Sequence, residues 1–394
     1  MNEQMKESEE SILHTYNRFP VVFEKGQGCY LYDSEGKEYL DFAAGIAVNS
    51  LGYHYPGYDE ALKEQIDKLM HISNLYYNEP IIEAGAKLVK AGKMSKAFFT
   101  NSGTEAIEGA LKAAKKYAYV RDGHADHEII AMNHSFHGRS IGALSVTGTA
   151  HYREPFEPLM GGVKFADFND LESVKAQITD KTCAIITEVV QGEGGIYPAK
   201  KEFLEGLRQI CDEKDIMLIF DEIQCGMGRT GHYFAWQAYG VQPDIMTNAK
   251  ALGCGVPVGA FVLGEKAARA SLEPGDHGTT YGGNPFVCAA VSKVFDIYEN
   301  DKIIEHVQEM TPYLEQKLDE IVAKHECAAT RRGMGFMQGI VIQGRPVGEV
   351  VKAALAKGLL VISAGSDVLR IVPPLVITKE HIDKMAAILD ECME

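Results

Sequence analysis

Two carboxylates, Asp221 and Glu222, end the apolar run "MLIF", and the residues 226–231 that follow spell G-x-G-x-x-G. A dinucleotide-binding turn uses such glycines to hold a pyrophosphate at a helix N-terminus, where two neighbouring carboxylates would repel it. Such a motif also needs an acidic residue at the end of the next strand to hold the ribose. The next acid at a suitable spacing, Asp244, begins a predicted strand instead of ending one. The sequence therefore favours another role for Asp221.

A carboxylate at the carboxyl end of a central parallel strand points into the ligand crevice of an α/β sheet. Asp221 could there pair with a protonated heteroaromatic nitrogen, as pyridoxal phosphate requires for its electron-withdrawing ring. The alternative is that Asp221 only caps a helix or pairs with a surface base. The cofactor hypothesis further requires a lysine, an anion-binding turn and a residue that stacks on the ring.

Lys250 is the candidate lysine, in "PDIMTNAKALGCGVPVGA", where it follows a predicted strand and precedes a Gly-rich turn. Most lysines are solvated surface residues, but this position at a strand end is poorly placed for the surface. Burial would lower the pKa of the amine toward the value that a nucleophile requires.

The candidate anion site is "FFTNSGTEAIEGALKAAKKY", a strand that runs into a helix. Ser102 or Thr104 could cap this helix, and Glu105 suits its first turn. The segment is either a plain capped helix or a phosphate site on the N–H groups of Gly103 and Thr104. Charge-assisted hydrogen bonds of about 1.5–3 kcal/mol each would outweigh a dipole contribution of roughly 0.3–1 kcal/mol.

The segment "NHSFHGRS" also follows a predicted strand. Phe136 could cover a planar ring, although a buried Phe is usually only part of the core. Arg139 presents a fork of donors that suits a substrate carboxylate.

Alternating strands and helices must position these residues, and the pattern predicts a largely parallel sheet covered on both faces. The expected strands are 96–100, 128–132, 183–190, 216–220, 244–248 and 259–264, and the expected helices include 103–118, 201–214, 284–298 and 301–322. After about residue 325 a smaller α+β part follows, with a hairpin, a helix near 347–357, a strand near 368–372 and a helix near 379–391. Short strands within 21–50 are expected to pack with it, because domain termini often lie close together.

Composition limits the function classes. A chain of 394 residues suits two or three domains, and a net charge of −16 argues against nucleic-acid binding. Eight scattered cysteines without C-x-x-C pairs argue against a zinc ribbon and favour reduced thiols, and we predict no metal site. The polar, acidic start shows no targeting signal and no long apolar run is present, so we expect a cytoplasmic protein without a membrane span.

Together, these motifs resemble those of the class III pyridoxal-phosphate-dependent aminotransferases over nearly the whole chain. The further matching segments are "LDFAAGIAVNSLG", "SNLYYNEP", "TEVVQGEGG", "HGTTYGGNP" and "VLRIVPPL". The resemblance implies an aspartate-aminotransferase-like fold: a large α/β domain with a mostly parallel seven-stranded sheet, and a smaller α+β domain from both termini. The implied boundaries are 1–57 for an N-terminal segment that packs with the small domain, 58–305 for the large domain and 306–394 for the small domain.

The resemblance also implies roles for individual residues. Lys250 would hold pyridoxal 5'-phosphate covalently, and Asp221 would pair with its ring nitrogen. The implied cofactor-binding residues are Ser102, Gly103, Thr104, Phe136, His137, Glu188, Asp221, Ile223, Gln224, Lys250 and Thr280, with Thr280 donated by the other subunit of a homodimer. The implied substrate-binding residues are Tyr16, Arg139, Glu193, Thr279 and Arg370, with Glu193 able to mask Arg370.

The implied reaction moves the terminal amino group of N2-acetyl-L-ornithine to 2-oxoglutarate and forms glutamate. Donors such as ornithine, succinylornithine, 4-aminobutyrate or lysine stay open, as does an aminomutase reaction, because donor choice depends on pocket residues around Tyr16, Gly45 and Ile46. A non-catalytic ligand-binding protein that kept the fold is the alternative from another class. The presence of both Lys250 and Asp221 argues against it.

Overall fold

Strand β10, Met217–Asp221, lies at the centre of a seven-stranded sheet. The computed structural model describes residues 3–394. The strand order is β4-β12-β11-β10-β7-β5-β6, and within this sheet only β12 runs antiparallel to its neighbours. The other strands are β4 Lys96–Thr100, β5 Glu128–Met132, β6 Val163–Ala166, β7 Thr182–Glu188, β11 Ile245–Asn248 and β12 Gly259–Leu263.

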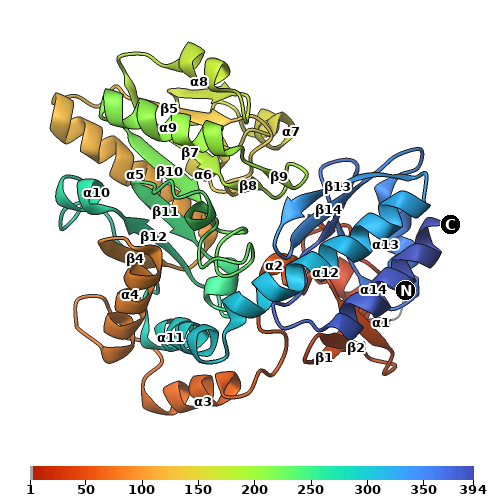
Figure 1. The fold of residues 1–394 in the computed structure, drawn as a ribbon. Coiled ribbons are helices and arrows are strands. Elements are labelled where there is room, and N and C mark those ends of the chain that lie inside the picture. Colours follow the sequence, from red (N-terminus) through yellow and green to blue (C-terminus); the bar gives the residue numbers. More distant parts are fainter. Residues whose placement is uncertain (1–2) are drawn as a thin grey trace.

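Helices cover both faces of this sheet because successive apolar residues of its strands point to opposite sides. Met217 and Ile219 of β10 pack in one cluster with the apolar face of α5, whereas Leu218 and Phe220 pack in the other with α4 and α9. Figure 1 shows these helices on either side of the sheet. Their bounds are α4 Glu79–Gly92, α5 Gly103–Asp122 and α9 Lys201–Lys214.

The sequence predicted six of the seven strands, and β6 was not predicted. The expectation of one strand over 183–190 was wrong at its end. β7 stops at Glu188, and Val190–Gln191 forms the separate short strand β8, which pairs with β9, Tyr197–Pro198. Glu188 therefore lies at a strand end, level with Asp221 on the neighbouring strand.

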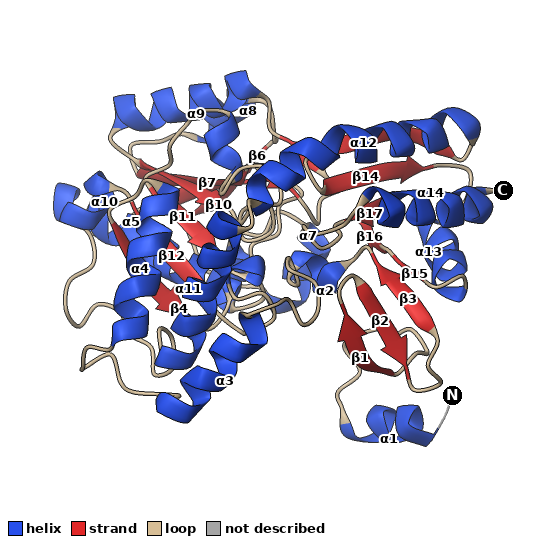
Figure 2. Cartoon of the chain, turned by 60° about the horizontal axis from the view of Figure 1, so that its bottom comes forward, coloured by secondary structure: helices blue, strands red, loops and turns tan. Residues whose placement is uncertain are grey.

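Two smaller sheets form the other part of the molecule. One has the order β13-β14-β17-β16 and the other the order β1-β2-β3-β15, so strand β3 from the N-terminal region pairs with β15 from the C-terminal region. This pairing agrees with the expected packing of the two terminal regions, and both ends of the described chain lie on this side (Figures 1 and 2). The strands are β1 Phe23–Gln27, β2 Tyr30–Asp33, β3 Glu38–Asp41, β13 Ala328–Met334, β14 Met337–Ile342, β15 Leu359–Leu360, β16 Ile362–Ala364 and β17 Val368–Ile371.

We propose domain boundaries at 1–57, 58–305 and 306–394, of which residues 1 and 2 lie outside the described residues. No helix in the described part of the chain is long and apolar enough to cross a bilayer. The remaining helices are α1 Glu3–Ser11, α2 Ala44–Ala47, α3 Tyr58–Lys68, α6 Ile141–Ser145, α7 Ala150–Arg153, α8 Leu171–Gln177, α10 Glu265–Arg269, α11 Pro285–Asn300, α12 Ile303–Lys324, α13 Val347–Ala356 and α14 Lys379–Met393, with the 3₁₀ turns η1 Glu154–Phe156, η2 Ala235–Ala238 and η3 Lys250–Leu252.

The G-x-G-x-x-G segment joins the two parts of the molecule. Residues 226–231 form turns and do not open a helix, which excludes a dinucleotide-binding turn. Within them Arg229 is almost fully buried and donates hydrogen bonds to the backbone oxygens of Phe336 and Pro373. The segment thus ties the loop after β10 to the C-terminal part of the chain.

Candidate active site

A cavity of about 320 Å³ opens at the carboxyl ends of β7, β10 and β11. This is the edge at which α/β sheets bind ligands. Most of the predicted site residues line it: Ser102, Gly103, Thr104, Phe136, His137, Glu188, Glu193, Asp221, Ile223, Gln224 and Lys250. The two residues on which the cofactor hypothesis depends therefore face one cavity.

The carboxylate of Asp221 is buried and held by three donors. Its Oδ2 lies 2.7 Å from Nδ1 of His137, and its Oδ1 accepts from the Ile223 N–H at 3.0 Å and the Thr247 hydroxyl at 3.3 Å. These three contacts fix the orientation of the Asp221 side chain at the cavity wall, where its carboxylate can meet a cation.

Lys250 begins η3 with φ of 47°, a left-handed conformation that is costly for a residue with a side chain. Among residues 3–394 no group accepts a hydrogen bond from its amine. Burial lowers the pKa of this amine, and the nearby carboxylates of Glu193, Asp221 and Glu188 offset the effect only in part. A lowered pKa leaves more of the amine neutral and nucleophilic.

The N-terminus of α5 forms an anion site on the cavity wall. Ser102 caps the helix, because its Oγ accepts from the Glu105 N–H at 3.2 Å. The N–H groups of Gly103 and Thr104 belong to the first turn and have no partner within the helix. A Cβ at Gly103 would lie 2.8 Å from Cδ1 of Ile223, so a larger residue here would push the Ile223 side chain aside. A phosphate fits such a site through the helix dipole and the unpaired donors.

Glu188 is a second buried acid beside Asp221. Its Oε2 has no hydrogen-bond partner among the described residues. Burial raises the pKa of Glu188 well above its ordinary value, and the charges of Asp221 and Glu193 add to the shift. Glu188 therefore takes up a proton more readily than an ordinary carboxyl group, which lessens its repulsion of the neighbouring Asp221.

These residues fit pyridoxal phosphate. An unpartnered lysine, a fixed carboxylate and an open helix N-terminus surround one cavity, and the ring of Phe136 lines the same space. They would meet the aldehyde, ring nitrogen, phosphate and ring face of this cofactor. The role of each cofactor-binding residue, including His137, stays a prediction.

Glu193 and Arg370 form an ion pair at the cavity rim. Arg370 is buried; its Nη1 lies 2.5 Å from Oε1 of Glu193 and its Nη2 lies 3.3 Å from Oε2. Burial raises the pKa of Glu193, but the charge and hydrogen bonds of Arg370 outweigh it, so the net pKa is lowered. Gln224 joins both, accepting from Arg370 at 3.1 Å and donating to Glu193 at 3.3 Å. Glu193 thus covers the charge of Arg370 in this structure, and a masking role during the reaction stays a prediction.

Five predicted site residues do not line this cavity. Arg370 lines a neighbouring hollow. Arg139 is exposed beside Phe136, and Tyr16 is 71% exposed on the N-terminal segment. Thr279 and Thr280 line a separate hollow that also contains Asn101. Their roles in substrate binding and in the site of a partner subunit stay predictions.

The sequence reasoning missed part of the cavity wall. The cavity is also lined by residues that were not predicted: Val48, Asn101, Val190, Cys225, Ala249, Gly255, Val256, Pro257 and Val258.

Val48 follows α2, in which all four residues have positive φ. Two backbone N–H groups at the start of this turn donate to the buried Asp41 carboxylate, at 2.9 and 2.8 Å. Asp41 following an apolar strand was a usable signal for this turn.

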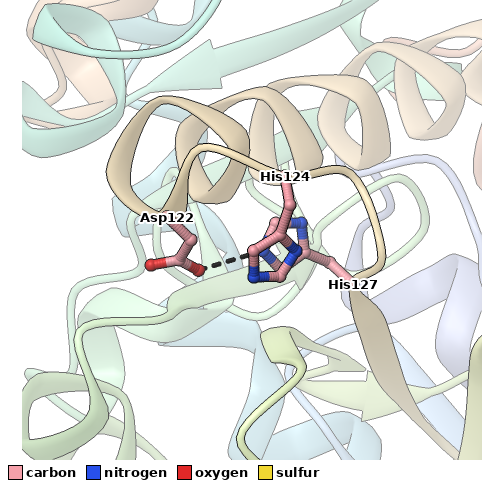
Figure 3. A group of neighbouring side chains, drawn as sticks. All are labelled: Asp122, His124 and His127. Atoms are coloured by element: carbon pink, nitrogen blue, oxygen red, sulfur yellow. Dashed lines mark hydrogen bonds and ion pairs between the residues drawn. The ribbon is translucent and has the colours of Figure 1, made fainter.

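A cluster of Asp122, His124 and His127 lies outside the cavity (Figure 3), and its ligand-type atoms lie within 4.8 Å of one another. Arg121 already donates to both carboxylate oxygens of Asp122, at 2.6 and 2.5 Å. The two imidazole rings stack face to face at 4.7 Å, so their in-plane lone pairs do not converge on one point. We therefore assign no metal role to this cluster.

Comparisons with known proteins identify the family of the chain. The family model for class III aminotransferases matches residues 12–393. An acetylornithine aminotransferase from Clostridium acetobutylicum is 47% identical, covering 98% of this chain and all of that protein. A succinylornithine transaminase from Yersinia pseudotuberculosis is 44% identical, over 95% of this chain and 92% of that protein. A structure of the ornithine aminotransferase from Toxoplasma gondii, with pyridoxal phosphate partly occupying its active site, superposes with a TM-score of 0.95 at 28% identity, over 99% of this chain and 93% of that one.

Proposed function

The chain belongs to the class III aminotransferases, and from this membership we propose that it transfers the terminal amino group of N2-acetyl-L-ornithine to 2-oxoglutarate. The products are N-acetyl-L-glutamate 5-semialdehyde and L-glutamate. The chain is a pyridoxal-phosphate-dependent transaminase with the mixed α/β fold of these enzymes. The relatives that act on N2-acylated ornithines, at 47% and 44% identity, support this class of amino donor.

The proposal depends on two arginines, Arg370 and Arg139, of which one is paired with a carboxylate and the other is not. Arg370 at the rim is neutralised by Glu193, whereas no described residue accepts a hydrogen bond from the exposed guanidinium of Arg139. A donor whose reacting amine lies far from its carboxylate suits this arrangement, with its carboxylate on Arg139 and uncharged chain near the masked Arg370. Glutamate carries a carboxylate on the reacting carbon and would use Arg370 once Glu193 moves aside.

Pyridoxal phosphate, when bound, supplies an aldehyde that combines with amines and a ring that withdraws electrons from the reacting carbon. Asp221 would pair with the ring nitrogen and keep it protonated, because three donors hold its carboxylate in place at the cavity wall. Lys250 would hold the cofactor and, once its amine is released, carry the proton from the substrate carbon. Positioned proton transfer of this kind contributes about 10²–10⁴ in rate.

We also propose a homodimer, since large apolar side chains are exposed in one stretch of the chain: Ile66, Leu69, Met70, Leu75, Tyr76 and Tyr77. Monomers rarely leave such groups in water when they gather on one surface. Burial of this stretch against a second copy would account for them.

All eight cysteines are unpaired, which supports a cytoplasmic location, because disulfides are typical of oxidising compartments.

A panel of amino donors tests the proposed substrate. Purified enzyme would be incubated with 2-oxoglutarate and one donor at a time, and glutamate release followed. We expect kcat/KM for N2-acetylornithine to exceed the values for ornithine, N2-succinylornithine, 4-aminobutyrate and lysine. A higher value for another donor would replace the proposed substrate and leave the transaminase assignment intact.

Replacing Glu193 by alanine should change substrate preference. Arg370 would then stay unmasked. When the acylated donor binds, its uncharged chain would offer the Arg370 guanidinium no partner, so the charge of Arg370 would be left unpaired. Hydrogen bonds to charged groups contribute about 1.5–3 kcal/mol, so the ratio of single-turnover rates for acetylornithine over glutamate should fall at least about tenfold. Glu193→Gln keeps a polar group without the charge and should give a smaller change. An unchanged ratio in the alanine variant would exclude the masking role.

A further inference from the structure

The guanidinium of Arg139 rests on an aromatic surface. Its central carbon lies 4.1 Å from the ring centroid of Tyr152 and 5.3 Å from that of Phe136. No side chain among residues 3–394 accepts a hydrogen bond from this guanidinium or forms an ion pair with it. The group is therefore held by ring contacts alone, and its N–H donors stay open to a ligand.

Tyr152 touches two predicted site residues at once. It lies on the short helix α7, is half-buried, and meets the Phe136 ring edge-on with centroids 5.8 Å apart. The ring centroid of His151 lies 4.0 Å from that of Tyr152. The same ring thus contacts the residue predicted to cover the cofactor and the residue predicted to bind the substrate carboxylate.

The backbone of Arg139 is fixed separately. Its N–H donates to the Thr104 hydroxyl at 3.3 Å, on the helix that carries the anion site. The Glu108 carboxylate of the same helix accepts from the N–H groups of Gly142 and Ala143, at 3.0 and 3.2 Å. These bonds fix where the side chain starts but leave its long stem free. Only the ring contacts orient the guanidinium at its tip.

We infer that Tyr152 is a positioning residue that pre-orients Arg139 to receive the carboxylate of the amino donor. A side chain already ordered before binding loses less conformational freedom when the ligand arrives, so affinity rises without a new contact to the ligand. The role belongs to the aromatic face of Tyr152, because its hydroxyl donates to no described residue. The inference rests on the proposed function, in which Arg139 binds the donor carboxylate.

N-acetyl-L-norvaline tests the inference, because it keeps the carboxylate and acyl group of the proposed donor but lacks the reacting amine. Its dissociation constant would be measured by calorimetry on the holoenzyme and on the protein freed of cofactor. Tyr152→Leu should weaken binding about three- to thirtyfold in both forms, the range of a cation–π contact. Tyr152→Phe keeps the ring and should bind as the parent does. Unchanged binding in the leucine variant, or a loss in the phenylalanine variant, would overturn the inference.

Arg139→Leu separates the inference from the proposed function. If this variant binds N-acetyl-L-norvaline as tightly as the parent, Arg139 is not the clamp and the proposed function loses its main support. If Arg139→Leu loses binding but Tyr152→Leu does not, only the role of Tyr152 fails. In the Arg139→Leu background, Tyr152→Leu should add no further loss, and an additive loss would show that Tyr152 acts independently of Arg139.

Kinetics with the proposed donor give a second readout. Tyr152→Leu should raise the KM for acetylornithine by the same factor and leave kcat within about twofold of the parent, since uniform binding contributes to KM alone. A loss confined to kcat would contradict positioning of Arg139. Thermal unfolding would confirm that the fold is kept, and Tyr152→Met, which fills more of the space without an aromatic face, would carry the same test if the leucine variant unfolds.

Discussion

Replacing Lys250 by alanine should remove the near-visible absorbance of the cofactor-bound enzyme and nearly all turnover. Lys250 is the only lysine that lines the described cavity, and its unpartnered amine has a pKa lowered by burial. Loss of positioned proton transfer alone should cost about 10²–10⁴ in rate, and loss of the covalent attachment adds to this. The absorbance spectrum and kcat of the purified variant measure both effects.

Lys214→Ala provides a matched control. Lys214 lies exposed at the end of α9, and no described residue forms an ion pair with it, so this variant should keep both the absorbance band and the turnover of the parent. Retention of the band and of turnover in Lys250→Ala would show that another amine binds the cofactor. The assignment of the active site would then be wrong.

Asp221→Asn should lower turnover strongly and affect cofactor affinity less. Asparagine keeps the shape but removes the negative charge that faces the cavity, and the loss of one pre-organised charge-stabilising group typically costs about 10²–10³ in kcat. Cofactor binding would persist because the N-terminus of α5 and Lys250 remain. Steady-state kinetics and a cofactor titration followed by absorbance separate the two quantities.

Asp221→Glu keeps the charge while displacing it, so it should retain more turnover than Asp221→Asn. Equal losses in the two variants would mean that the shape of the side chain matters more than its charge. Turnover near that of the parent in Asp221→Asn would exclude the electrostatic role and leave Asp221 as an anchor for His137.

The strands that carry the site could be predicted because their short apolar runs favour a buried strand over other secondary structures. Residues 217–220 are apolar and end at a carboxylate, and in the structure both faces of β10 are buried. Strand β6 escaped prediction because its four residues include Lys164 and three of them are only partly buried, so its hydrophobic pattern is weak. The anion site could also be predicted, since Ser102 and Gly103 follow the local rules for a helix start.

The turn at Ala44–Ala47 shows where local rules fail. Its alanines favour a right-handed helix, yet Ala44, Gly45, Ile46 and Ala47 have φ of 48°, 64°, 64° and 62°. Left-handed geometry costs roughly 1–2 kcal/mol for each residue other than glycine. The Asp41 carboxylate accepts from the N–H groups of Ala43 and Ala44, at 2.9 and 2.8 Å, and is itself held by the Tyr53 hydroxyl at 2.8 Å, which helps to stabilise the turn. Propensity scales for single residues contain no such bonds from a side chain to the backbone.

The sequence by itself determined six of the seven strands of the large sheet, the strand ends at which Asp221 and Lys250 lie, and the helix start that can hold an anion. These features depend on the periodicity of apolar residues and on bonds between near neighbours in the chain. Only the tertiary structure decided that His137 meets Asp221 across 84 positions, that Glu193 pairs with Arg370 across 177, and that Arg139 lies on the Tyr152 ring. Such contacts depend on strand order and on the packing of separate layers, which local sequence patterns do not specify.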